Sequence, residues 1–174
     1  MTTISEREGG DVRVFTFKDG LLSAVAHDLE IAVERFSITW DDARAKVSAT
    51  FDATSLRVLH AVVNGQPSPG TLSSRDLAKI ERNITHDVLG AHSQSHVRFE
   101  SSSIAANGEG FVIRGMLTLA GRANEISANV RREGARLVTE VAIDQPRWGI
   151  VPYTAMMGAL RVKSEIRVRV RVPA

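Results

Sequence analysis

Hydrophobic and polar residues alternate with a period of two along most of this chain. The clearest case is the C-terminal segment, where Ile166, Val168, Val170 and Val172 alternate with Arg167, Arg169 and Arg171. Successive side chains of a β-strand point to opposite faces, so this spacing predicts strands with one buried and one solvated face. One-sided alternation is typical of antiparallel sheets, because the strands of a buried parallel sheet are apolar throughout.

The same pattern recurs often enough to predict about eight strands. We expect them at Val12–Phe17, Leu29–Trp40, Ala45–Phe51, His96–Ser103, Phe111–Leu119, Glu125–Arg132, Leu137–Ile143 and Ile166–Val172. Within the second segment the apolar positions change phase near Glu34 and Arg35, which predicts a bulge or bend there. Turn-forming residues such as Asp19-Gly20 separate the runs. Strands at this near-hairpin spacing predict an all-β sandwich or barrel.

Residues 73–90 break the period of two and are predicted to form a helix. The apolar residues that recur there at steps of three and four, as on one face of a helix, are Leu77, Ile80, Ile84 and Val88. Ser73 and Asp76 have the spacing of a capping box, and Gly90 suits the position just beyond a helix C-terminus. We expect residues 64–70 to form a loop, residues 1–11 to be flexible, and residues 1–174 to form a single domain.

Composition narrows the class of protein without identifying it. The chain has 174 residues, 43% hydrophobic and 24% charged, with a net charge of +2, as expected for one globular domain. The absence of cysteine excludes disulfide scaffolds, thiolate catalysis and cysteine-ligated zinc. No apolar run is long enough for a transmembrane helix, and acidic residues stand where a signal peptide needs positive charge, so we expect a soluble cytoplasmic protein.

Histidines are the first candidates for catalytic or metal-binding residues. His86, His92 and His96 lie close together in sequence, but we expect them in a helix, a loop and a strand, with no carboxylate to complete a site. The chain also lacks a nucleophile elbow, a phosphate-binding loop and a dinucleotide-binding fingerprint. The sequence therefore predicts no metal site, no cofactor and no catalytic residues. An enzyme that uses His27 with His92 and His96 stays an alternative.

The three arginines of the C-terminal segment raise the question of a nucleic-acid partner. Modules that bind RNA or single strands need stacking aromatic residues among their basic residues, and this strand face has none. A charged outer face that prevents edge-to-edge pairing is the preferred interpretation, so no nucleic-acid partner is expected. Because Ile166–Val172 is a candidate edge strand, a homodimer stays open.

Several segments, taken in order, resemble the YceI-like family. The family's "vLda..yP.i.F.S", "G.LTi.G" and "idR..fGi" elements and its closing strand resemble, respectively, Asp87–Ser103, Gly115–Gly121, Ile143–Ile150 and Val162–Val172. Ala53–Leu56 is similar to its "a.Sl" element, and His27 matches the histidine after its first strand pattern. The resemblance extends over roughly residues 12–172.

The resemblance implies an eight-stranded antiparallel, lipocalin-like β-barrel that holds a polyisoprenoid, an isoprenoid quinone or a fatty-acyl lipid. From the alternation we expect the cavity to be lined by Phe15, Phe17, Ile31, Val47, Phe51, Phe99, Ile113, Leu117 and Trp148. His27 is a candidate at the cavity mouth, where Met156 and Met157 offer adaptable apolar surface. The expected function is non-catalytic binding or transport of a lipid. The alternative is a packed barrel that serves as a stress-related or protein-interaction module without a lipid ligand.

Overall fold

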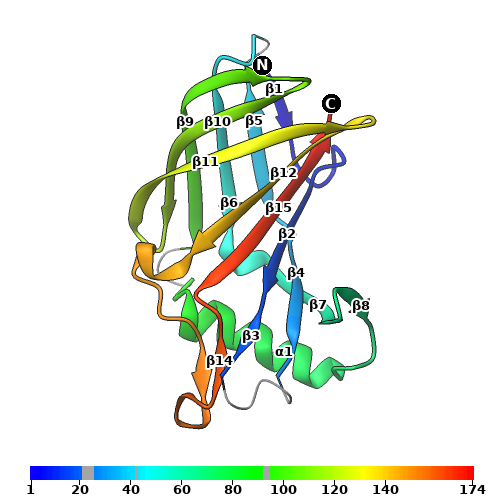
Figure 1. Cartoon of the computed structure of the whole chain (residues 1–174), viewed down its shortest axis with the longest axis vertical. Helices are drawn as coiled ribbons and strands as arrows, with labels where there is room; N and C mark the ends of the chain where they lie inside the picture. Colours follow the sequence, from blue (N-terminus) through cyan, green and yellow to red (C-terminus); the bar gives the residue numbers. More distant parts are fainter. Residues whose placement is uncertain (21–25, 42, 92–94) are drawn as a thin grey trace.

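Most of the chain folds into one strongly curled antiparallel sheet with a helix across one of its ends (Figure 1). This computed structural model describes residues 1–20, 26–41, 43–91 and 95–174. In that part of the chain, twelve strands follow one another around the large sheet in the order β1-β5-β6-β9-β10-β11-β12-β15-β2-β4-β7-β8. A second, three-stranded sheet has the order β13-β14-β3.

The strands differ greatly in length. Their bounds are Thr2–Ile4 (β1), Asp11–Thr16 (β2), Lys18–Asp19 (β3), Asp28–Val33 (β4), Phe36–Trp40 (β5), Val47–Asp52 (β6), Leu56–Val63 (β7), Gln66–Ser68 (β8), His96–Asn107 (β9), Gly110–Leu119 (β10), Arg122–Glu133 (β11), Arg136–Asp144 (β12), Thr154–Ala155 (β13), Leu160–Val162 (β14) and Glu165–Pro173 (β15). The helical segments are Ala53–Ser55 (η2), Ser74–Arg82 (α1), Asn83–Val88 (η3), Gln145–Trp148 (η4) and Met156–Gly158 (η5).

A bend between β4 and β5 places these two consecutive strands in different parts of the sheet. β4 pairs with β2 and β7, whereas β5 pairs with β1 and β6. At the bend, Ser55 accepts the Glu34 N–H on its carbonyl at 3.2 Å and the Arg35 N–H on its hydroxyl at 2.9 Å. The predicted change of phase near these two residues is confirmed, and the bend helps the sheet to curl back on itself.

A register shift in the β9–β10 pair adds to the curl. The shift lies between Arg114 and Gly115 on β10. A Cβ atom at Gly115 would lie 2.3 Å from the Glu100 carbonyl oxygen and 2.7 Å from the Phe99 ring. Only glycine therefore allows β9 and the Phe99 ring to approach this closely, and such irregularities increase the bending of a strand pair.

The helix lies at the end of the sheet that is opposite the two chain termini (Figure 1). Ser73 and Asp76 form the predicted capping box, with both of its hydrogen bonds present. α1 continues directly into η3, and Gly90 follows with a φ of 55°. Together α1 and η3 extend over Ser74–Val88, within the predicted range 73–90.

The predicted antiparallel β class with one short helix is confirmed, but the number of strands differs from eight. β7 was not expected, because its buried positions change phase where Leu59, 37% exposed, is skipped in the pairing between Glu30–His60 and Ile31–Val58. The first eleven residues, expected to be flexible, include β1, which pairs with β5. The suggestion that Ile166–Val172 is an edge strand is wrong, since β15 lies between β12 and β2.

Candidate functional site

A cavity of about 820 Å³ lies inside the curled sheet. Every second residue of the long strands faces it, as alternation requires. On β15 these residues are Ile166, Val168, Val170 and Val172, and on β12 they are Leu137, Thr139, Val141 and Ile143. The lining is apolar along most of its length, which is the property of a site that excludes water and accepts hydrocarbon.

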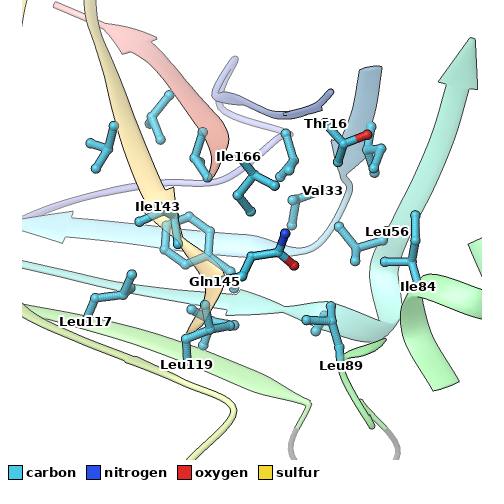
Figure 2. A pocket seen from close by; sticks show the side chains of 18 of the residues that line it. Thr16, Val33, Leu56, Ile84, Leu89, Leu117, Leu119, Ile143, Gln145 and Ile166 are labelled. Carbon is cyan, nitrogen blue, oxygen red and sulfur yellow. The ribbon is translucent and has the colours of Figure 1, made fainter. Parts of the chain in front are cut away.

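The helical segment supplies one end of the cavity. Its apolar stripe turns toward the sheet, and the residues from this part of the chain that line the cavity are Leu72, Ile80, Ile84, Val88 and Leu89. Figure 2 shows Ile84 and Leu89 across the cavity from Leu117, Leu119 and Ile143 of the sheet. None of the residues described for α1 and η3 is fully buried, and their apolar side chains are partly buried against the core residues around the cavity.

Polar groups gather at the end of the cavity near α1. The polar lining residues contributed by α1, η3 and the chain beside them are Lys18, His27, Asp76, Lys79, Asn83, Tyr153 and Arg161. Hydrogen bonds from the Ser73 hydroxyl and N–H hold the pKa of Asp76 below its usual range. Far from α1, the Arg44 guanidinium lies 5.4 Å from the centre of the Phe111 ring. The cavity therefore combines a long apolar interior with charged groups near its ends.

One polar side chain lies deep in the apolar part. Gln145 is the first residue of η4, is 6% exposed and lines the cavity. Its amide points into the cavity among the side chains of Leu56, Leu89 and Leu119 (Figure 2). Nothing in the sequence singles out Gln145, because a glutamine just after a strand resembles any polar turn residue.

Seven of the predicted site residues come together around the cavity. These are His27, Ile31, Val47, Phe51, Phe99, Ile113 and Leu117. Their contact with a ligand stays a prediction. Sequence reasoning missed Trp40, Phe111 and Gln145, and it identified the helix stripe without assigning it to the cavity.

Five predicted residues do not line the cavity. Phe15 and Phe17 point the other way, because β2 turns Val14 and Thr16 inward. Phe15 instead lies beneath Arg169 on the outer face, with the guanidinium 5.1 Å from the ring centre.

Trp148 and the two methionines are also placed differently from the expectation. Trp148 is 1% exposed, and its Nε1–H donates a hydrogen bond to the Leu117 carbonyl at 2.9 Å, so the indole packs in the wall. Met156 and Met157 are 65% and 107% exposed on the η5 turn. Both methionines have positive φ.

Of the histidine and arginine candidates that the structure describes, only His27 lines the cavity. His86 lies in η3, His96 begins β9, and His92 lies outside the described residues. Within the described ranges, no group of three or more metal-ligating side chains is found. Arg167, Arg169 and Arg171 lie on the outer face, within 3.1 Å, 3.7 Å and 2.6 Å of carboxylate oxygens of Glu140, Glu30 and Asp11. None of the described helices is long and apolar enough to span a bilayer.

Comparison with known proteins supports the resemblance seen in the sequence. The crystal structure of BcnA from Burkholderia cenocepacia is similar, with a TM-score of 0.65 and 18% identity over 95% of this chain and 96% of that one. A polyisoprenoid binding domain from Saccharophagus degradans has a TM-score of 0.59 and 11% identity, covering 94% and 92% of the two chains. A Campylobacter jejuni YCEI protein has a TM-score of 0.56 and 16% identity, covering 83% and 82%. These likenesses establish the fold.

No curated protein sequence matches this chain. The sequence profile of the YceI-like domain, however, matches residues 12–174, which is nearly the whole chain. The chain belongs to the YceI-like family.

Proposed function

We propose that this protein binds one long apolar molecule, an isoprenoid or another lipid, inside its curled sheet and does so without catalysis. The observation that supports this most strongly is the cavity of about 820 Å³, whose walls are apolar side chains from the sheet and from the helical segment. A packed barrel, the alternative function, would fill this space with side chains. The similar domain from Saccharophagus degradans is described as polyisoprenoid-binding, which favours the same ligand class here.

The driving force follows from the lining. Each methylene group that leaves water for such a cavity contributes about 0.8 kcal/mol, so a long chain gains affinity in proportion to its length. The polar groups near α1 give a head group somewhere to remain hydrated while the chain is buried. Binding and carrying a lipid need no further chemistry from the protein.

The first test is to identify what co-purifies with the protein. Native mass spectrometry should show the intact chain with one added small molecule, and organic extraction should release a lipid or isoprenoid. Re-binding of geranylgeraniol to the extracted protein then gives an affinity for variants.

A matched pair of variants on one strand distinguishes the cavity from the outer surface. Ala128 of β11 is 9% exposed and lines the cavity, whereas Ala123 on the same strand is exposed and faces outward. Ala128→Phe should weaken binding at least about tenfold by occupying ligand volume, and Ala123→Phe should leave it unchanged. Equal affinities for both variants, or an extract without any apolar compound and no re-binding, would contradict the proposed function.

A further inference from the structure

The Gln145 side chain is held in one position by its surroundings. Its backbone N–H donates to the Ser164 carbonyl at 2.9 Å, and its own carbonyl accepts the Ile150 N–H at 3.2 Å. The side-chain Nε2–H donates to the Lys163 carbonyl at 3.2 Å. Turning the amide over would place its oxygen against that carbonyl oxygen, so the amide orientation is fixed with Nε2 toward the wall.

The opposite atom of the amide is an unused acceptor. No residue in the described part of the chain donates a hydrogen bond to Oε1 of Gln145. Figure 2 shows this oxygen among the apolar side chains of the cavity. Gln145 lines the cavity, so a bound molecule can supply the donor that the protein itself does not offer to this oxygen.

A second unsatisfied oxygen lies at the same level of the wall. On β2, Phe15 is paired with Arg167 of β15, so the next residue of β2, Thr16, lies beside Ile166 of β15. Ile166 is in turn paired with Ile143 of β12. Oγ1 of Thr16 is buried without a hydrogen-bond partner among the described residues. Thr16 lines the cavity, and a change of χ1 rotamer can move its hydroxyl to another staggered position that faces the cavity.

Other polar groups in the apolar part of the cavity are already satisfied. The hydroxyl of Thr139 donates to the Asn129 carbonyl at 2.9 Å. Beyond the level of Gln145, away from α1, the inward residues of β12 and β15 include Val141, Val168 and Val170 beside the bonded Thr139. Gln145 and Thr16 therefore form a polar layer in the cavity wall. On the side of this layer away from α1, the cavity is lined mainly by apolar residues.

We propose that the ligand carries a neutral hydroxyl, which donates a hydrogen bond to Oε1 of Gln145 while its apolar chain fills the cavity beyond. This inference rests on the proposed function and specifies the head group of its ligand as that of a long-chain or isoprenoid alcohol. An ether or ester has no donor and would leave Oε1 unpaired. An anionic head would place negative charge against an oxygen that is itself negatively polarised.

Three matched compounds test the head group: geranylgeraniol, its methyl ether and geranylgeranyl diphosphate. Each is titrated into delipidated protein, with displacement of the fluorophore N-phenyl-naphthylamine as the readout. The alcohol should bind about tenfold more tightly than the ether, which is the difference expected for one hydrogen bond to a buried acceptor.

Variants assign that preference to one atom. Gln145→Leu removes the acceptor, so it should abolish the preference for alcohol over ether. Thr139→Val is the control, because its hydroxyl lies in the same lining but is already bonded, and it should keep the preference. If Gln145→Leu does not fold, Gln145→Met has an unbranched chain of similar length and the same expected result.

The outcomes separate this inference from the proposed function. Equal affinities of the wild-type protein for alcohol and ether, or a preference for the diphosphate, would overturn the assignment of a hydroxyl but leave a lipid-binding cavity. Persistence of the preference in Gln145→Leu would overturn the role of Gln145. Failure of all three compounds to displace the fluorophore would contradict both.

Discussion

Glu30 organises a charged cluster on the outer face of β15, β2, β4 and β7. Its carboxylate lies 2.8 Å from Nε2 of His60, 3.6 Å from Nε of Arg13 and 3.7 Å from a guanidinium nitrogen of Arg169. The Glu30 side chain is only 12% exposed. These contacts join four adjacent strands through one carboxylate and pair Arg169, as Glu140 and Asp11 pair the other two arginines of β15.

Replacing Glu30 should therefore cost more stability than replacing a typical surface carboxylate. Glu30→Gln removes the negative charge from three nitrogen-bearing side chains, and we expect a loss of about 1–3 kcal/mol in the free energy of unfolding. Glu140→Gln is the control, because Glu140 is 37% exposed beside Arg167 and should cost less than about 1 kcal/mol. Urea denaturation of both variants measures the difference, and equal losses would argue against a central role for Glu30.

Asp52 makes stability depend on pH at the corner between β6 and β7. Partial burial raises the pKa of Asp52, but hydrogen bonds from the Thr54 hydroxyl and N–H and from Arg35 outweigh this effect, so the pKa lies below its usual range. A lowered pKa means that the contribution is present above the unfolded value of roughly 3.9 and is lost as the pH falls through the folded value.

Asp52→Asn should therefore cost about 1 kcal/mol near neutral pH and less in acid. The measurement is urea denaturation of the wild type and the variant at about pH 7 and about pH 3. The stability gap between the two proteins should narrow at the lower pH. A gap that stays constant would show that ionisation of Asp52 does not contribute.

At the scale of elements, α1 depends on its N-terminal cap more than most helices do. It faces a cavity and lacks fully buried residues, so packing stabilises it less than a helix on a filled core. Ser73→Ala removes the side chain that accepts the Asp76 N–H, and should destabilise the helix by about 1 kcal/mol. Hydrogen exchange should increase in residues 74–88 and stay unchanged in β10 and β11. Uniform faster exchange would instead indicate global destabilisation.

Alternation predicts which face of a strand is buried only where the other face is polar. This condition holds for β15, whose orientation was predicted, and does not hold for β2, where the prediction failed. On β15 every outward residue from Glu165 to Arg171 is charged, so only one assignment of faces is consistent with burial. On β2 both faces carry apolar residues, Val12 and Val14 on one and Phe15 on the other. The structure resolves this by covering Phe15 with Arg169 from the neighbouring strand, a tertiary contact that no local pattern contains.

Other parts of the site depend on tertiary contacts in the same way. The position of Gln145 in the cavity follows from the Ser164 and Lys163 carbonyls, which belong to the segment before β15. The apolar face of the helix could be recognised from the spacing of its residues in the sequence. That this face borders an open cavity depends on the curl of the sheet, which the spacing does not predict. The fold class was therefore predictable from local patterns, whereas the polar atoms inside the cavity were not.

At the scale of the whole molecule, an unfilled apolar cavity should make the protein less stable than its complex. Atoms that line an empty space lack contacts on one side, and a ligand that binds only the folded state stabilises it by mass action. At a free ligand concentration one hundred times Kd the gain is about 2.7 kcal/mol, which for a chain of this size raises Tm by roughly 5–10 °C.

We therefore expect delipidated protein to melt at a lower temperature than protein purified with its ligand, and geranylgeraniol to restore the difference. Differential scanning calorimetry measures both transitions. Ala128→Phe should respond less to the added compound, because the new ring occupies part of the cavity, while Ala123→Phe should respond as the wild type does. Identical Tm values for the delipidated and ligand-saturated wild type would mean that this cavity takes up no ligand of this class, since a compound that binds only the folded state must raise Tm.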